Sequence, residues 1–146
     1  MRSLAELESV FELPAAVPDI RSQAEELLKA SEEVLEHWIV ARGDVPTSDT
    51  REGFRLLALH RQGTKGDPSF NACRETCREI VYHYNLVTMR DVHSDITDRL
   101  YMMGMISRHL YLFVSGKMQV AELGEFCCSS KPIRSDDAAT TTREGS

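Results

Sequence analysis

The run LYMMGMISRHLYLFV, residues 100–114, is apolar around nearly the whole circumference of a helix. Arg108 and His109 interrupt it, and no stretch reaches the roughly 18 uninterrupted apolar residues typical of a membrane span. A helix with this pattern is either central in its bundle or has one face against another chain. We therefore expect a helix over residues 94–115 in an all-α fold, and a homodimer formed through residues 92–114.

The segments on either side carry the period of amphipathic helices and the signals that end them. A short helix is expected over residues 3–12, followed by a linker containing two prolines. Asp19 is expected to cap a long second helix that stops at Gly43. Thr47 or Ser48 is expected to cap a third helix that ends near residue 60. Asp67 and Pro68 predict the start of a fourth helix that reaches about residue 88.

Gly116 is expected to end the central helix, with a short final helix over residues 117–126. No segment alternates with a period of two, so no strand is expected. The fold class is thus a compact bundle of four to five main helices in a single domain, residues 1–126. Within it, residues 1–18 form the N-terminal helix and Pro-rich linker, and residues 19–126 the bundle. The tail, residues 127–146, is small, polar and aperiodic, which predicts disorder.

Composition narrows the class of protein. Hydrophobic residues make up 42% and charged residues 27% of the chain, as in an ordinary globular domain. The net charge of -6 argues against non-specific binding to nucleic acid. The acidic N-terminus lacks the pattern of a signal peptide, so we expect a cytoplasmic protein whose four cysteines are reduced thiols.

The charge is distributed unevenly. Residues 1–49 contain 4 basic and 11 acidic side chains, whereas residues 51–78 contain 6 basic and 3 acidic ones. A basic region in an acidic protein predicts contact with an anionic ligand or an acidic protein partner. The sequence therefore favours a non-enzymatic binding or regulatory module. Its candidate ligand-binding residues are Arg51, Arg55, Arg61, Lys65 and Arg74.

Two cysteines in the same region allow a second hypothesis. On a helix, Cys73 and Cys77 fall in the middle of an apolar face, where free cysteine packs as a small hydrophobic residue. With His83 they resemble the alkylhydroperoxidase D-like proteins, whose CxxC motif is followed by a histidine, although the spacing here is CxxxC. The resemblance implies a thiol oxidoreductase with catalytic Cys73 and Cys77, and with His83 as a proton-handling neighbour. Simple packing predicts instead that both thiols stay unreactive until the protein unfolds.

Other kinds of site have weaker support. No cofactor and no metal site are expected, because Cys73 and Cys77 supply only two ligands and His83 lies too far along the helix to join them. The pairs Glu33/His37 and Glu79/His83 fall on faces that the periodicity predicts to be solvated. The methionine-rich helix allows a third hypothesis, an apolar small-molecule carrier.

Overall fold

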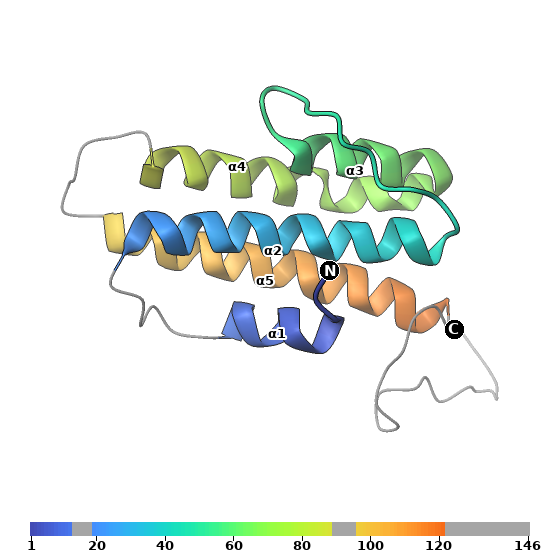
Figure 1. The fold of residues 1–146 in the computed structure, drawn as a ribbon, viewed down its shortest axis with the longest axis horizontal. Helices are drawn as coiled ribbons and strands as arrows, with labels where there is room; N and C mark the ends of the chain where they lie inside the picture. The colour runs from blue at the N-terminus through green and yellow to red at the C-terminus, as the bar shows by residue number, and fades with distance from the viewer. Residues whose placement is uncertain (13–18, 89–95, 122–146) are drawn as a thin grey trace.

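A computed structural model describes residues 1–12, 19–88 and 96–121 (Figure 1). In these segments the fold is the expected all-α bundle. Its elements are α1 (Leu4–Glu12), α2 (Ile20–Ala41), α3 (Arg55–Gly66), the 3-10 helix η1 (Pro68–Cys73), α4 (Arg74–Thr88) and α5 (Ile96–Val120). The expected linker and tail lie outside the described residues. Within those residues, no helix is long and apolar enough to span a membrane.

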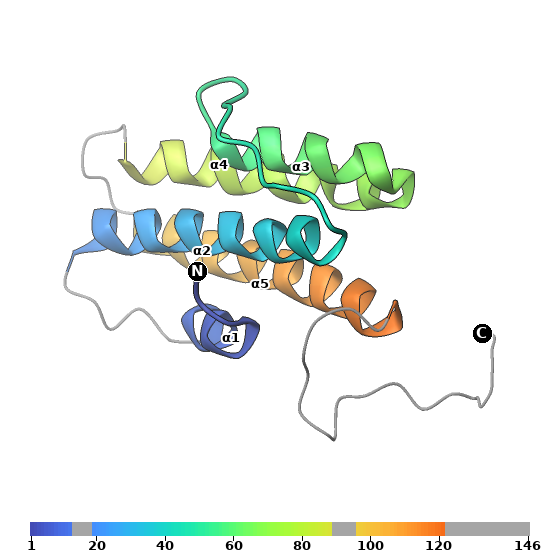
Figure 2. The ribbon, with the colours of Figure 1, turned by 45° about the vertical axis from the view of Figure 1, so that its right-hand side comes forward.

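Helices α2 and α5 lie side by side along the long axis of the molecule. Figures 1 and 2 show α1 on one side of this pair, with α3 and α4 on the other. Helix α5 packs against α1, α2 and α4, which explains why it is apolar on several faces. Of the two alternatives for this helix, the structure shows the central position in the bundle of a single chain, and the expected homodimer stays a prediction.

An aromatic hub fills the end of the bundle where α2, α3, η1 and α5 meet. We define it as Trp38, His60, Phe70 and Phe113. Phe70 is fully buried, and its ring stacks on Trp38 with centroids 5.2 Å apart. The rings of His60 and Phe113 each lie 5.8 Å from that of Phe70. Phe70 thus joins three helices through one side chain.

The third helix differs from its expected position. It begins at Arg55, and residues 44–54 form a loop instead of its first turns. The expected cap Thr47 is engaged within this loop, where its Oγ1 accepts a hydrogen bond from the Asp49 backbone at 3.0 Å. Gln62 holds the loop against α3 by accepting from Thr47 N and donating to Val45 O. These contacts between distant residues outweigh the local capping signal.

The central helix continues through Gly116, where the sequence predicted its end. Its last turns are held by tertiary contacts: Met118 is buried, and Lys117 Nζ lies 3.2 Å from Asp67 Oδ2 and 2.7 Å from Ser69 Oγ. Packing therefore outweighs the low helix propensity of glycine. The end of α3 also differs, because the helix continues to Gly66, past the expected end near residue 60. Three other helix ends agree with expectation: Asp19 caps α2, Gly43 has a φ of 84° just past its end, and Asp67 caps η1 ahead of Pro68.

The close approach of α3 to Phe70 requires glycine at position 63. A Cβ there would lie 2.9 Å from two ring carbons of Phe70. We predict that Gly63→Ala destabilises the protein by about 1–3 kcal/mol, because the buried ring cannot move aside freely. Gly116→Ala is the matched control: nothing lies within 4 Å of its Cβ, so it should gain roughly 0.5–1 kcal/mol from helix propensity. Urea denaturation of both variants measures the difference, and equal effects would contradict the steric argument.

Candidate functional site

A polar cavity of about 370 Å³ opens between α3, the start of α4 and the turn at residues 51–54. Four guanidinium groups line it: Arg51 from the turn, Arg61 from α3, and Arg74 and Arg78 from α4. We call it the arginine cavity. Its volume lies within the range of roughly 300–1,000 Å³ typical of small-molecule sites. The side chains of His60, Asn71 and Thr64 complete a wall rich in hydrogen-bonding groups.

The structure brings together three of the five candidate ligand-binding residues, Arg51, Arg61 and Arg74. Lys65 lines a neighbouring hollow of about 410 Å³ that shares Arg51 and Arg61 with the cavity. Arg78 was not among the candidates, although its four-residue spacing from Arg74 places both on one face of a helix. That spacing is the signal that could have identified it.

The four arginines differ in how they are paired. Arg78 forms hydrogen bonds of 3.0 and 3.2 Å with Glu52, and these bonds lower the pKa of the Glu52 carboxyl. Glu52 has a φ of 55° and Gly53 a φ of 86°, as in a tight two-residue turn closed by the bridge between Arg51 and Phe54. The turn thereby holds a carboxylate at the cavity edge.

Arg74 has only an exposed contact of 3.6 Å with the neighbouring Glu75. The side chains of Arg51 and Arg61 make no ion pair or hydrogen bond within the described part of the chain, and both residues are exposed. Two of the four cavity cations are therefore without a counter-ion from the described residues. A local excess of positive charge is the property that an anion-binding site needs.

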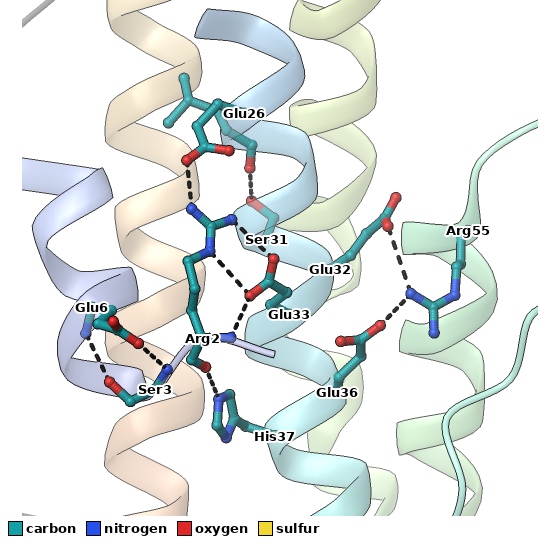
Figure 3. Close-up of polar contacts among 11 residues, drawn as sticks. Arg2, Ser3, Glu6, Glu26, Ser31, Glu32, Glu33, Glu36, His37 and Arg55 are labelled. Carbon is teal, nitrogen blue, oxygen red and sulfur yellow. Dashed lines mark hydrogen bonds and ion pairs between the residues drawn. The ribbon is translucent and has the colours of Figure 1, made fainter.

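Arg55 lies elsewhere. Its guanidinium forms an ion pair with Glu36 on α2 and lies 3.7 Å from Glu32 (Figure 3). Its Nε donates a hydrogen bond to Thr47 O. Burial raises the pKa of Glu32, and the charge of Arg55 opposes this effect. The acidic surface of α2 thus engages Arg55, which makes it a connection between α2 and α3 and not part of the cavity.

A second arginine is held by α2 at the N-terminus of the chain. Arg2 bonds to Glu33 through its backbone N–H, its Nε and its Nη2, and to Glu26 at 2.5 Å through its Nη1 (Figure 3). His37 Nε2 lies 2.6 Å from Arg2 O. Burial would raise the pKa of Glu33, but the hydrogen bonds from Arg2 outweigh it and the net pKa is lowered.

These contacts correct the sequence prediction for Glu33. The periodicity of α2 placed this residue on a solvated face, but its side chain is only 8% exposed because Arg2 covers it. The periodicity of one helix cannot reveal that a distant N-terminal segment packs on its polar side.

The two cysteines, which we call the thiol pair, belong to the segment whose residues Asn71, Arg74 and Arg78 line the arginine cavity. Cys73 is 2% exposed and Cys77 fully buried, so the wheel position predicted for both is confirmed. The pKa of the Cys73 thiol is lowered to about 6, first by a hydrogen bond with Cys77 and against the effect of burial, with His60 contributing further. The same hydrogen bond and burial raise the pKa of Cys77. Cys73 is therefore the more acidic thiol.

One backbone carbonyl organises this arrangement. Phe70 O accepts a hydrogen bond from Cys73 Sγ at 3.2 Å, and the Nε2 atom of His60 lies 3.1 Å from the same oxygen. The carbonyl favours the protonated form of Cys73, whereas Cys77 and His60 favour the thiolate. His60 also lines the arginine cavity, so one ring connects the cavity with the thiol pair.

His83 does not take the place that the resemblance implied. It lies six residues beyond Cys77, about 9 Å along the helix axis. The residue is buried rather than solvated, and its Nδ1 atom has no hydrogen-bond partner among the residues that the structure describes. Burial lowers its pKa, and the charge of Arg99 lowers it further. His60, which precedes the cysteines in the sequence, is the histidine that shifts the pKa of Cys73.

Two apolar features are relevant to the remaining hypotheses. A groove of about 480 Å³ lies between α1, α2 and α5, with Phe11, Leu27 and Leu100 among its lining residues. On α5, Tyr101, Met105 and Leu112 are exposed at 69%, 44% and 47%, and we call them the α5 outer face. In the described ranges 1–12, 19–88 and 96–121, no three His, Cys, Asp or Glu side chains are grouped so as to hold a metal ion.

Comparisons with protein-family models, curated proteins and solved structures give no match for this chain. Its function therefore has to be inferred from the chemistry of the cavity and its surroundings.

The Arg2 contacts supply a test of the N-terminal packing. We predict that Arg2→Ala destabilises the protein by about 1–3 kcal/mol, because it leaves the buried Glu33 carboxylate unpaired while Arg2 itself is partly solvated. Adding Glu33→Gln should recover part of this loss, because the neutral amide is less costly to bury. Chemical denaturation of the two single variants and the double variant measures the coupling. Additive effects would show that the pair contributes nothing specific.

Proposed function

We propose that the protein is a non-enzymatic binding module whose arginine cavity holds a small, compact anionic ligand in the cytoplasm. The observation that carries this proposal is the convergence of four guanidinium groups on one cavity, two of them without a counter-ion among the described residues. Arginine binds carboxylate and phosphate groups through two parallel N–H bonds, so such a cluster suits an oxyanion.

The lining indicates what kind of anion fits. Leu57 is the only aliphatic residue in the wall, and the remaining positions are charged or polar. A long hydrocarbon chain would leave these groups without hydrogen bonds, which is unfavourable. A phosphate-class or polycarboxylate ligand would use several arginines at once. The net charge of -6 makes nucleic acid an unfavourable partner, because the rest of the chain repels it.

An acidic protein is the alternative ligand. It would engage the exposed Arg51, Arg61 and Lys65 across the two adjoining hollows without needing the depth of the arginine cavity. The two cases differ at Arg78, which lines the arginine cavity but not the adjoining hollow. Binding that depends on Arg78 favours the small anion.

We also propose that the α5 outer face joins two copies of this chain. Its three large apolar residues follow one helical stripe, and solvent exposure of such a stripe is unfavourable. Arg108 and Glu12 line the same adjoining groove. A two-fold axis would let each of these charges meet its opposite on the other copy, so the face is complementary to itself.

Anion binding can be tested with inorganic pyrophosphate by isothermal titration calorimetry. We predict that Arg61→Ala weakens binding by roughly 10- to 100-fold, since a hydrogen bond to a charged group contributes about 1.5–3 kcal/mol. Glu52→Gln should strengthen binding, because it removes a negative charge and frees Arg78. Arg21→Ala, an exposed change outside the cavity, is the matched control. Binding that is equal in all four proteins, or absent from the wild type, would refute the proposed ligand class.

Dimerisation can be tested by sedimentation equilibrium. We predict that Leu112→Glu converts a dimer into a monomer, because it introduces a charge into the apolar contact. Tyr82→Glu on α4 changes an equally exposed apolar residue outside the α5 outer face and should leave the dimer intact. A wild-type protein that remains monomeric at high micromolar concentration would rule out this interface.

A further inference from the structure

The thiol pair lies at the junction of two helix types. Cys73 is the last residue of η1 and Cys77 is in the first turn of α4. Residues four apart in an α-helix have Cβ atoms about 5–6 Å apart, whereas a disulfide needs about 3.5–4.5 Å. An unbroken α-helix would resist this closure. A 3-10 segment has weaker hydrogen bonds, so unwinding the end of η1 can supply the movement while α4 stays folded.

The pKa values of the two thiols are shifted in opposite directions, so that one thiol can ionise and act as a nucleophile while the other keeps its proton. Cys73 is the more acidic thiol, with Cys77 and His60 favouring its thiolate. Cys77 keeps its proton because it is fully buried and bonded to Cys73. A thiolate is the nucleophile in reactions with peroxides and disulfides, and a neighbouring thiol can then displace oxygen from the oxidised sulfur.

The arginine cavity adjoins the segment that contains Cys73. Asn71 and Arg74, on either side of Cys73 in the sequence, line that cavity together with His60. Cys73 itself is buried and is not among the residues that line the cavity, but its neighbours are. A small uncharged oxidant can reach Cys73 from the cavity through local opening of the structure.

We propose that the thiol pair is a peroxide-oxidisable site that forms a Cys73–Cys77 disulfide and thereby alters the arginine cavity. In the first step, the Cys73 thiolate attacks one oxygen of hydrogen peroxide. A sulfur–oxygen bond forms, the oxygen–oxygen bond breaks, and the departing hydroxide takes a proton to become water. In the second step, Cys77 sulfur attacks Cys73 sulfur and releases the oxygen as a second water, which carries the Cys77 proton. The two thiols supply both electrons that reduce the peroxide.

The effect on the cavity follows from shared structure. Forming the disulfide removes the hydrogen bond from Cys73 to Phe70 O and shifts the end of η1 relative to α4. Asn71 and Arg74 belong to this junction, so the cavity wall must move with it. Weaker anion binding in the oxidised protein is the expected result, and this part of the inference rests on the proposed function.

The experiment uses the full chain with Cys127→Ser and Cys128→Ser, so that only the thiol pair can react. Hydrogen peroxide is added to the native protein, and the mass of the peptide containing both cysteines is followed. A loss of two hydrogens is expected. Adding Cys77→Ala should stop the reaction at a sulfenic acid on Cys73 that dimedone traps, and adding Cys73→Ala should abolish trapping. Circular dichroism confirms that each variant is folded.

His60 is a positioning residue in this scheme, and it has its own readout. His60→Gln should shift the pH midpoint of Cys73 alkylation upward, an effect that loss of packing alone does not produce.

Thiols that remain reduced in the native protein at peroxide levels that oxidise the unfolded chain would overturn the proposal. Complete disulfide formation with unchanged pyrophosphate affinity would overturn the coupling to the cavity. If the reduced protein binds no pyrophosphate, the proposed function fails, and the mass change still decides the thiol chemistry.

Discussion

The packing of Phe70 is the constraint on which the rest of the structure depends. Its ring is enclosed by Trp38, His60 and Phe113, and it approaches α3 so closely that position 63 can only be glycine without rearrangement. Its carbonyl meanwhile accepts from Cys73 and lies within hydrogen-bond distance of His60. One residue of a six-residue 3-10 helix therefore fixes the position of α3 through its side chain and that of the thiol pair through its backbone. The arginine cavity lies between α3 and the start of α4, and His60 belongs both to its lining and to the contacts of Phe70.

Electrostatics explain why an acidic chain has a basic cavity. Helix α2 carries much of the acidic excess, and four of its glutamates engage Arg2 and Arg55. These two ion-pair networks neutralise the acidic face of α2 within the bundle. The four cavity arginines are not part of these networks, and Glu52 and Glu75 offset only part of their charge. The net charge alone does not predict the cavity, because the acidic residues of α2 are paired with Arg2 and Arg55 and do not neutralise the cavity arginines.

The sequence predicted those features that depend on local chemistry. Asp19, Gly43, Asp67 and Pro68 act at helix ends through their own side chains or backbone, and the helical period placed both cysteines in the core. It failed where distant residues compete with a local signal. Thr47 looks like a cap but is held in a loop by Gln62, and Gly116 looks like a stop but lies between turns anchored on Asp67 and the core. The candidate site was therefore predicted only in part. The basic region of the sequence pointed to Arg51, Arg61 and Arg74. That Arg55 pairs with α2 and that His60 lies near Cys73 depends on contacts between distant residues, which the sequence pattern does not show.

The proximity of the cavity and the thiol pair would make anion binding and thiol ionisation, as proposed above, depend on each other. An anion bound among the arginines would place negative charge beside His60, and through it near Cys73. Like charge raises the pKa of a thiol, so an occupied cavity would hold Cys73 in its protonated and less reactive form. Conversely, a thiolate at Cys73 would disfavour an anion in the cavity by the same interaction, because coupling between two sites is reciprocal. Ligand binding and thiol oxidation would then oppose each other even before any disulfide forms, through the electrostatic interaction that His60 transmits. Formation of the disulfide would add a conformational contribution, the unwinding of the end of η1.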